Sequence, residues 1–226
     1  ALAWWVVEES MGLSRNEILL GCKGTKNIPN VQAIVDRLRR FEPIQYIFGH
    51  SVWNGLDLIV TPDTLIPRPE TAELVERIAR LRNSKEPLKI LDVGTGSGCI
   101  AIALKKAFPF GQVTGVDVSE EALVVAKKNA ERNGVEVNFK KMDILSDFNE
   151  QKCQYDIVIS NPPYICESEK KDMRANVLEY EPGTALFVPD KDPLLFYRRI
   201  ADLRWGKYLF FEINERFAQQ IQEMLR

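Results

Sequence analysis

Four consecutive residues, Asn161-Pro162-Pro163-Tyr164, combine groups that suit the handling of a planar nitrogen. The side-chain oxygen of Asn161 can accept one N–H, and the backbone carbonyl of Pro162 can accept a second. The two prolines restrict the backbone and so preorganise these acceptors, while Tyr164 offers an aromatic face to a planar group. We therefore expect Asn161, Pro162 and Tyr164 to act in catalysis and all four residues to bind the substrate. A stiff strand-to-loop turn is the competing interpretation.

A glycine-rich turn, Gly94-Thr95-Gly96-Ser97-Gly98, lies between a predicted strand over 88–93 and an apolar helix predicted over 99–108. Glycines allow a tight turn and let a ligand approach the backbone. The third glycine comes one residue too early for the dinucleotide fingerprint, which disfavours NAD, and no Lys-Ser/Thr pair follows for ATP hydrolysis. S-adenosyl-L-methionine, an adenosine that carries a transferable methyl group, agrees with both the turn and the planar-nitrogen segment. A methyltransferase is therefore the expected enzyme class.

Further candidates lie where the next two predicted strands end. Asp117 follows the glycine turn by about twenty residues and can accept hydrogen bonds from ribose hydroxyls. The alternative is that Asp117 caps the next helix, although Ser119 can fill that role. Asp143 can accept from the adenine amine, and Phe148 is a candidate cover for the adenine ring. For Asp143 and Phe148, a turn aspartate and a core aromatic are equally good interpretations.

The elements that must position these residues follow from the hydrophobic pattern. Strands and helices alternate through the larger part of the chain, which predicts a mostly parallel, doubly wound sheet with right-handed crossovers. Ligands bind at the carboxyl edge of such sheets, so the glycine turn, Asp117 and Asn161 should meet there. The predicted helices cover 72–81, 99–108, 120–133, 193–203 and 216–225, and the predicted strands cover 88–93, 112–118, 135–141, 155–160 and 207–213.

The first part of the chain has a different pattern. Residues 1–47 carry apolar side chains at helical spacing, interrupted by glycines and a proline, and predict a small helical domain. Residues 48–66 surround Asn54-Gly55, a dipeptide that favours a two-residue turn, and predict a β-hairpin linker. The expected division is thus a helical domain over 1–47, the linker over 48–66 and an α/β, Rossmann-like domain over 67–226.

Composition narrows the functional classes further. The chain has 226 residues, 45% hydrophobic and 27% charged, as in an ordinary globular protein. No apolar run approaches the roughly 18 to 20 residues that span a bilayer, and the start lacks a basic leader, so we expect a cytoplasmic protein. A net charge of −2 and a pI of about 5.7 disfavour a nucleic-acid partner. One histidine and four cysteines without a C-x-x-C pair predict no metal site.

The sequence resembles the HemK/PrmC-type protein-(glutamine-N5) methyltransferases, which modify the glutamine of the Gly-Gly-Gln motif in peptide-chain release factors. The resemblance covers nearly the whole chain. It implies a class I methyltransferase fold, cofactor contacts from Gly94 to Gly98 and at Asp117, a ring contact near Phe148, Asn161 facing cofactor and substrate, and an N-terminal domain that grips the release factor. The matching segments are Pro43-Ile44-Gln45-Tyr46-Ile47-Phe48-Gly49, Leu65-Ile66-Pro67-Arg68-Pro69-Glu70-Thr71, Asp92-Val93-Gly94-Thr95-Gly96-Ser97-Gly98, Asn161-Pro162-Pro163-Tyr164 and Glu179-Tyr180-Glu181-Pro182.

The resemblance also places the loop 67–71 beside the cleft, where Arg68 and Glu70 either order the loop or form a plain surface ion pair. Three features depart from the family pattern. Ala72 stands where the family often has a further acid, the N-terminal helical part is short, and the final two strands of the fold are missing after the last predicted helix. We therefore expect a truncated chain with an exposed sheet edge.

Two other functions remain open from the residues alone. An adenine-N6 or cytosine-N4 nucleic-acid methyltransferase would present a similar planar amine to Asn161 after base flipping. That function needs a basic recognition surface, which the charge balance does not supply. The third hypothesis is a noncatalytic module that binds S-adenosyl-L-methionine, or another partner, without turnover.

Overall fold

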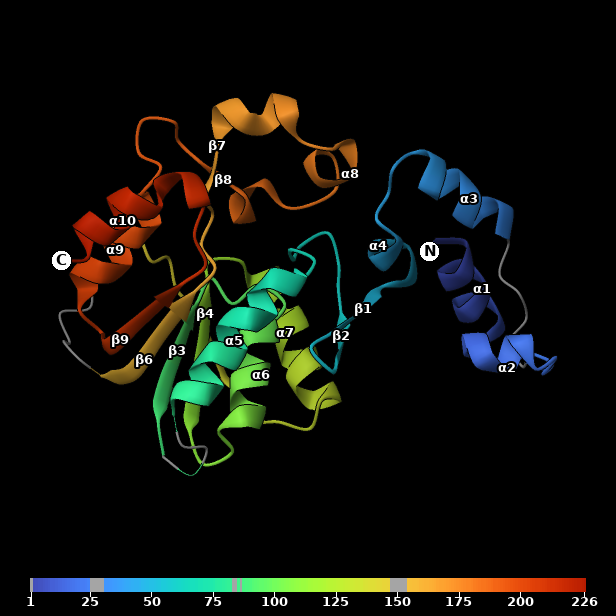
Figure 1. Ribbon diagram of the computed structural model, residues 1–226, viewed down its shortest axis with the longest axis horizontal. Coiled ribbons are helices and arrows are strands. Elements are labelled where there is room, and N and C mark those ends of the chain that lie inside the picture. Colours follow the sequence, from blue (N-terminus) through green and yellow to red (C-terminus); the bar gives the residue numbers. More distant parts are fainter. Residues whose placement is uncertain (1, 25–30, 83–84, 86, 147–153) are drawn as a thin grey trace.

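A parallel β-sheet forms the centre of the protein. The computed structural model describes residues 2–24, 31–82, 85, 87–146 and 154–226, and within them this sheet has five strands in the order β5-β4-β3-β6-β9 (Figure 1). All neighbouring strands run parallel. The strands are β3 Lys89–Val93, β4 Gln112–Asp117, β5 Asn138–Lys141, β6 Tyr155–Ser160 and β9 Gly206–Phe211.

The strand order reverses next to β3. The chain proceeds outward from β3 to β4 and β5, then returns to place β6 on the other side of β3 and β9 beyond it. In a doubly wound sheet such a reversal opens a crevice at the carboxyl ends of the two central strands. The fold is therefore the expected α/β, Rossmann-like architecture, with its switch point between β3 and β6.

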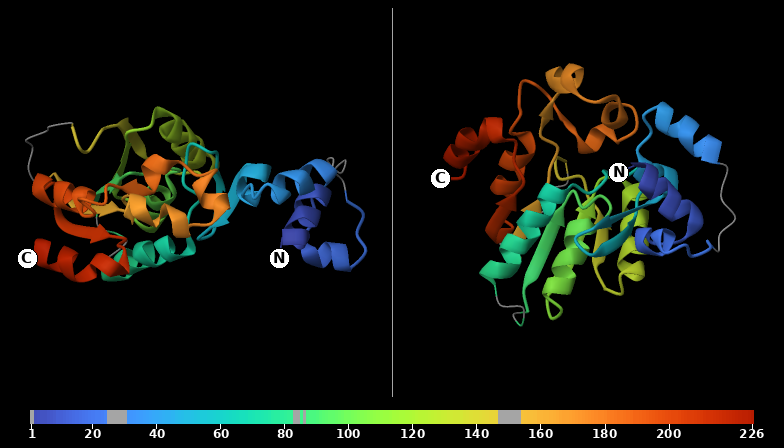
Figure 2. Two further views of the ribbon diagram at one scale, coloured as in Figure 1. Left: turned by 90° about the horizontal axis from the view of Figure 1, so that it is seen from above. Right: turned by 45° about the vertical axis from the view of Figure 1, so that its right-hand side comes forward.

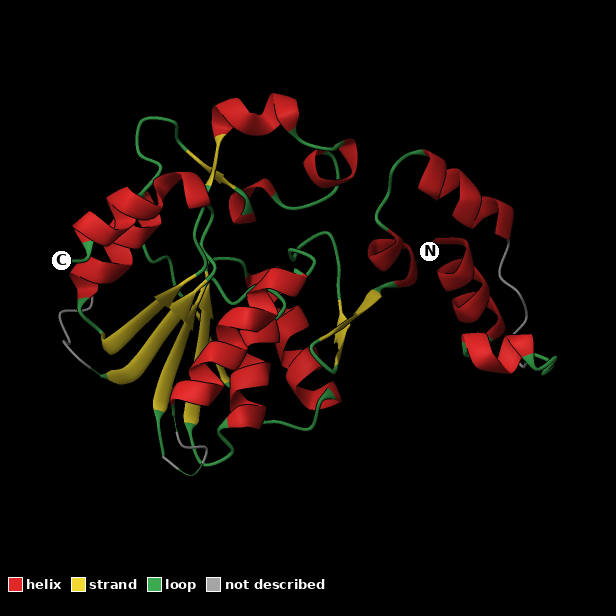
Figure 3. Cartoon of the chain, viewed as in Figure 1, coloured by secondary structure: helices red, strands yellow, loops and turns green. Residues whose placement is uncertain are grey.

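Helices cover both faces of this sheet (Figure 3). Helices α5 (Pro69–Leu81), α6 (Cys99–Ala107) and α7 (Glu120–Arg132) pack on one face, and α9 (Leu195–Leu203) packs on the other. The period of two along a strand explains the division: Ile90 belongs to the cluster under α5 and α6, whereas the next residue, Leu91, packs with Ile200 of α9.

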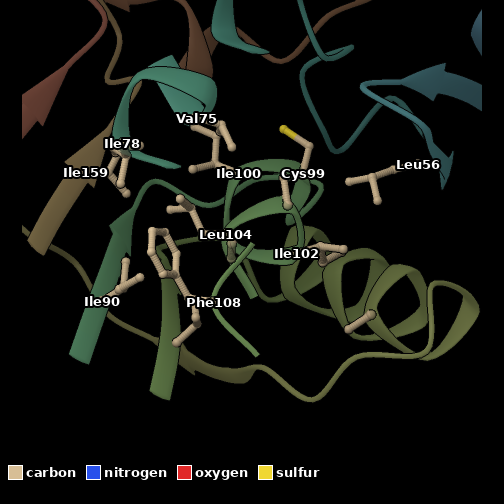
Figure 4. Close-up of a cluster of buried hydrophobic side chains, with 14 of the residues drawn as sticks. Leu56, Val75, Ile78, Ile90, Cys99, Ile100, Ile102, Leu104, Phe108 and Ile159 are labelled. Atoms are coloured by element: carbon tan, nitrogen blue, oxygen red, sulfur yellow. The ribbon is translucent and has the colours of Figure 1, made fainter. Parts of the chain in front are cut away.

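The larger core cluster surrounds α6 (Figure 4). Ile100, Ile102 and Leu104 are buried on several sides of this helix, because it lies between the sheet, α5 and α7. Phe108, just after the helix, is completely buried as well. Such all-round burial matches the continuous apolar sequence of the helix and fixes its N-terminus, which follows the glycine turn.

A hairpin and a group of helices precede the sheet domain, and the helices project from its side (Figure 2). The helices are α1 Leu2–Met11, α2 Arg15–Leu19, α3 Val31–Arg39 and α4 Ile44–Phe48. The hairpin joins β1 His50–Trp53 to β2 Leu56–Ile59. Asn54 and Gly55 have φ angles of 47° and 73°, the left-handed values that a two-residue turn of this type requires.

The segment that follows β6 lies beyond the carboxyl ends of the strands (Figure 1). It contains a two-residue parallel pairing that the hydrophobic pattern does not indicate. Its elements are β7 Ile165–Cys166, the 3-10 helix η1 Glu167–Asp172, α8 Ala175–Leu178, the 3-10 helix η2 Gly183–Ala185 and β8 Phe187–Val188. After β9 come the 3-10 helix η3 Glu215–Phe217 and α10 Ala218–Met224, so the last predicted helix is two shorter pieces.

Candidate active site

The glycine turn and the Asn-Pro-Pro-Tyr segment begin side by side at the carboxyl edge of the sheet. Val93, the last residue of β3, is paired in register with Ser160, the last residue of β6. The buried Ser160 hydroxyl donates to the backbone carbonyl of Val93 at 2.7 Å, which ties the two strand ends together. Gly94 and Asn161 therefore follow neighbouring positions, as the sequence pattern predicts.

The five residues of the glycine turn divide into an accessible and a buried group. Gly94 and Gly96 are at least partly exposed, have φ angles of 72° and 53°, and have open space where a Cβ would point. Thr95 and Ser97 are buried, and Gly98 packs so closely that a Cβ there would come within 3.1 Å of α7. A ligand in this crevice therefore meets the backbone of Gly94 and Gly96, while the other three residues shape the turn from within.

Asp117, at the end of β4, holds the middle of this turn. One carboxylate oxygen accepts from the backbone N–H of Gly96 at 2.8 Å, and the other accepts from the N–H of Ser119 at 3.0 Å. Ser119 itself caps α7, since its hydroxyl oxygen accepts from the N–H of Ala122 at 3.0 Å. A carboxylate oxygen can accept more than one hydrogen bond, so Asp117 retains capacity for the hydroxyls of a ribose.

Asp143 follows β5, next to the end of β4, where the Met142 N–H donates to the Asp117 carbonyl at 2.9 Å. Its carboxylate accepts from the N–H of Leu145 at 2.9 Å and from the hydroxyl of Ser146 at 2.8 Å. These hydrogen bonds hold the pKa of Asp143 below its ordinary value. Asp143 thus orders its own turn, and the neighbouring candidate Phe148 lies outside the described residues.

The buried acid Asp92 lies beneath the glycine turn, and the sequence motifs indicate no role for it. One oxygen accepts from the Thr95 hydroxyl at 2.6 Å and from the N–H of Ala101 at 3.2 Å. Within the described part of the chain the other oxygen has no hydrogen-bond partner. Burial, only partly offset by these hydrogen bonds, raises the pKa of Asp92 to about 7.

The glycine turn, Asp117 and Asp92 together determine whether S-adenosyl-L-methionine fits the crevice. Open space at Gly94 and Gly96 admits a ligand against the backbone, and Asp117 retains acceptor capacity for ribose hydroxyls. Asp92, whose second oxygen has no hydrogen-bond partner among the described residues, lies beneath the same turn, and a nearby cation such as this ligand favours its ionised form. The residues therefore fit the group.

Asn129 of α7 joins the hairpin to the glycine turn. Its amide nitrogen donates to the carbonyls of Ile59 and Ser97, each at 2.9 Å, and its oxygen accepts from the N–H of Ile59 at 2.6 Å. The side chain is completely buried, so water cannot take the place of these hydrogen bonds. The position of the turn thus depends on the hairpin, although the two are far apart in the sequence.

The Asn161 side chain makes one hydrogen bond among the described residues, from its amide nitrogen to the Thr71 hydroxyl oxygen at 3.3 Å. Thr71, buried in the first turn of α5, donates to a carboxylate oxygen of Glu212 at 2.6 Å. The Tyr164 hydroxyl lies 3.2 Å from the other oxygen of Glu212. Pro162 is buried, whereas Asn161, Pro163 and Tyr164 are partly exposed.

Burial and the neighbouring Glu212 charge raise the pKa of Tyr164 to about 12, so its hydroxyl stays protonated and donates to Glu212. Thr71 ends the loop 67–71, which the family resemblance places beside the cleft without a role for this residue, and Glu212 belongs to none of the matching segments. Glu212 directly follows β9, and a polar residue after a largely apolar strand at this edge is the signal that indicates it.

The loop before α5 is fixed by a buried acid from the segment beyond the sheet. Glu181, whose side chain is 1% exposed, pairs with Arg68 at 2.6 Å and accepts from the N–H of Ile66 at 3.1 Å. The indole N–H of Trp53 in the hairpin donates to the Arg68 carbonyl at 2.6 Å. The ion pair of Arg68 is therefore formed with a buried glutamate, and Glu70 is not its partner.

The described residues also bear on membrane insertion and metal binding. No helix in them is long and apolar enough to cross a membrane. The same residues contain no group of three or more His, Cys, Asp or Glu side chains arranged to hold a metal ion.

Comparison with known proteins identifies the relatives of this chain. Residues 71–180 match the family described as "Methyltransferase small domain". A relative from Bacteroides thetaiotaomicron, named "Release factor glutamine methyltransferase", is 47% identical over 218 residues, which cover 94% of this chain and 76% of the relative. A protein of the same name from Flavobacterium psychrophilum is 47% identical over 204 residues, covering 86% of this chain and 70% of the relative.

Among solved structures, a methyltransferase from Pyrococcus furiosus superposes with a TM-score of 0.52 at 19% identity, and the match covers 86% of each chain. This likeness shows the fold. The sequence identity to the named relatives goes further, because it extends through the helical part, the hairpin, the glycine turn and the Asn-Pro-Pro-Tyr segment. The chain belongs to the release factor glutamine methyltransferase family.

Proposed function

We propose that this protein transfers a methyl group from S-adenosyl-L-methionine to the side-chain amide nitrogen, N5, of the glutamine in the Gly-Gly-Gln motif of peptide-chain release factors. The observation that supports it most is the placement of Asn161 next to the glycine turn, with its amide nitrogen occupied by Thr71. The side-chain oxygen of Asn161 then faces away from Thr71 as an acceptor for an N–H of the substrate.

The bound cofactor supplies an electrophilic methyl group on a sulfonium. The backbone at Gly94 and Gly96 and the carboxylate of Asp117 hold it, with Thr95, Ser97 and Gly98 shaping the turn from inside. We retain Asp143 and Phe148 as candidates near the adenine.

The substrate amide is neutral and planar, so its nitrogen is a weak nucleophile that must be oriented. Asn161 Oδ1 and the Pro162 carbonyl accept its two N–H groups and leave the face of the nitrogen free to attack. Pro163 restricts the backbone of this segment. Tyr164 is anchored through its hydroxyl, and its ring packs against the planar group. The nitrogen takes the methyl group as the bond from that carbon to sulfur breaks, becomes cationic, and then releases one N–H proton to water.

The remaining parts of the proposal concern the partner and the arrangement of the chain. We propose that the helical residues 1–47 bind the release factor, that the linker over 48–66 connects them to the methyltransferase domain over 67–226, and that the protein acts in the cytoplasm, where translation terminates. In support, the hairpin contacts both the glycine turn, through Asn129, and the loop before α5, through Trp53.

The test is methyl transfer from isotopically labelled S-adenosyl-L-methionine to a purified release factor. Label should appear on the Gly-Gly-Gln peptide and should disappear when its glutamine is replaced by alanine. The Asn161→Ala variant should lose turnover by about a hundredfold or more while still binding S-adenosyl-L-homocysteine. A matched control, Asn138→Ala on the exposed edge strand β5, should keep the wild-type rate.

Labelling that persists without the glutamine refutes the proposed substrate. Label on DNA or RNA oligonucleotides but not on protein supports a nucleic-acid methyltransferase instead. Cofactor binding without transfer to either substrate supports a noncatalytic module.

A further inference from the structure

We propose that Glu212, acting through Thr71, is a positioning residue that fixes which end of the Asn161 side-chain amide faces the substrate. This inference rests on the proposed function, since it names the residues that prepare the acceptor for the glutamine nitrogen. It concerns Thr71 and Glu212, two residues to which the sequence motifs give no role in the reaction.

The three side chains form a continuous chain of hydrogen bonds across the carboxyl edge of the sheet. Glu212 Oε2 and Thr71 Oγ1 are 2.6 Å apart, and Thr71 Oγ1 and Asn161 Nδ2 are 3.3 Å apart. Glu212 follows β9, Asn161 follows the neighbouring strand β6, and Thr71 enters from the first turn of α5 above them. Thr71 is 2% exposed, so water does not compete for its hydroxyl.

The direction of each hydrogen bond follows from the charge at one end. An ionised carboxylate only accepts, so the single hydroxyl proton of Thr71 must point to Glu212. The Thr71 oxygen can then only accept from Asn161, which has to present its NH2 group. The Asn161 oxygen is thereby turned away from Thr71 and becomes the acceptor that the substrate amide requires.

The reversed amide is unfavourable for the same reason. If Asn161 presented its oxygen to Thr71, two oxygens would face each other at this distance with no proton between them, because the Thr71 proton is held by Glu212. Without Glu212 the Thr71 proton could point to either neighbour, and both amide orientations would be permitted. The carboxylate therefore selects one orientation that geometry alone does not select.

Glu212 itself is held from several sides. Its backbone N–H donates to the Ser160 carbonyl at 3.1 Å, and its carbonyl accepts from the Tyr197 hydroxyl at 3.1 Å. Its second carboxylate oxygen accepts from Tyr164. One carboxylate thus orients both polar side chains of the Asn-Pro-Pro-Tyr segment.

The test compares Thr71→Val, Thr71→Ser and Glu212→Gln with the wild type in methyl transfer to a Gly-Gly-Gln peptide. Thr71→Val keeps the shape of the side chain but removes the hydroxyl, and Glu212→Gln keeps the size but can donate to Thr71. Both should lower kcat by about ten- to hundredfold, with the KM for S-adenosyl-L-methionine unchanged, because a misoriented acceptor affects the reacting group rather than cofactor binding. Thr71→Ser, which keeps the hydroxyl, should retain most of the wild-type rate. Thr114→Val, a buried threonine on β4 outside this network, is the matched control.

A second readout does not require turnover. The side-chain NH2 of Asn161, assigned by NMR from its disappearance in Asn161→Ala, should exchange slowly with solvent in the wild type and Thr71→Ser. It should exchange faster in Thr71→Val and Glu212→Gln, while thermal unfolding and calorimetric binding of S-adenosyl-L-homocysteine confirm that the fold and cofactor site persist.

The outcomes separate the two proposals. If the wild type does not methylate the peptide but the NH2 group behaves as stated, the proposed substrate is wrong and the positioning role of Glu212 stands. If Thr71→Val and Glu212→Gln keep the wild-type rate, or keep the slow exchange, the positioning role is overturned.

Discussion

Replacing Asp92 by asparagine should make the ligand-free protein more stable near neutral pH. Asp92 is completely buried, and one of its oxygens has no partner in the described part of the chain. Burial raises its pKa from an ordinary value of 3.8 to about 7, which means that the folded protein favours the protonated acid. Asparagine has the same shape and still offers an oxygen to Thr95 and Ala101, but it never becomes charged.

The pH window follows from the direction of this change. Between about pH 4 and about pH 7 the unfolded chain releases the proton that the folded protein retains, so stability falls as pH rises, by about 1.4 kcal/mol per pH unit. The contribution is complete below the unfolded pKa and is lost once the pH passes the folded pKa. The whole rise in the pKa of Asp92 corresponds to on the order of 4 kcal/mol.

Urea unfolding of the wild type and Asp92→Asn over this pH range measures the effect. The difference in stability should shift in favour of the variant by on the order of 3 kcal/mol between about pH 4.5 and about pH 7. Asp143→Asn is a control that should show no such slope in this range, because hydrogen bonds lower the pKa of Asp143 from its ordinary value of 3.8 and its contribution is lost only as pH falls below that value. Parallel curves for the wild type and Asp92→Asn would refute the idea that Asp92 is a destabilising buried acid.

Three further substitutions test how the turn and the loop are held. Gly98→Ala should cost about 1–3 kcal/mol in thermal unfolding, because its φ of 81° and the contact with α7 both oppose a Cβ; an unchanged Tm would contradict this. Asn129→Leu should cost about 3 kcal/mol or more in urea unfolding, since it leaves backbone groups of β2 and the turn unpaired, and a neutral effect would show that water replaces them. Glu181→Gln should cost about 1–3 kcal/mol by leaving Arg68 uncompensated, and should lower kcat more than Glu70→Gln does; equal effects would argue against the buried ion pair.

The sequence predicts the centre of the fold well because local sequence signals mark where its strands and helices begin and end. The glycine turn separates β3 from α6, and the observed bounds differ from the predicted ones by only a residue. The Asn54-Gly55 dipeptide likewise predicts the hairpin, because few residue pairs accept two left-handed conformations in succession.

Elements that depend on distant partners are predicted poorly. The predicted strand over 135–141 is regular only from Asn138, where it begins to pair with β4. The pairing of β7 with β8 involves two residues on each strand, too few to show a period. A predicted helix over 216–225 is divided at Ala218, where a 3-10 turn precedes the α-helix.

The site shows the same division between local and distant signals. That Asn161 and Gly94 meet follows from the parallel topology, since both come directly after neighbouring strands. Thr71 and Glu212 contact each other across 141 positions of the chain, and Thr71 contacts Asn161 across 90. No spacing rule connects such positions, so the hydrogen bonds among these three residues emerge only from the folded structure.

A structure of the protein with S-adenosyl-L-homocysteine and a Gly-Gly-Gln peptide tests the central claim most directly. The predicted result is that the glutamine amide nitrogen donates to Asn161 Oδ1 and to the Pro162 carbonyl, with Asn161 Nδ2 still on Thr71 and the homocysteine sulfur facing the nitrogen. A glutamine that points its oxygen at Asn161, or a peptide bound away from the Asn-Pro-Pro-Tyr segment, would contradict the proposed function.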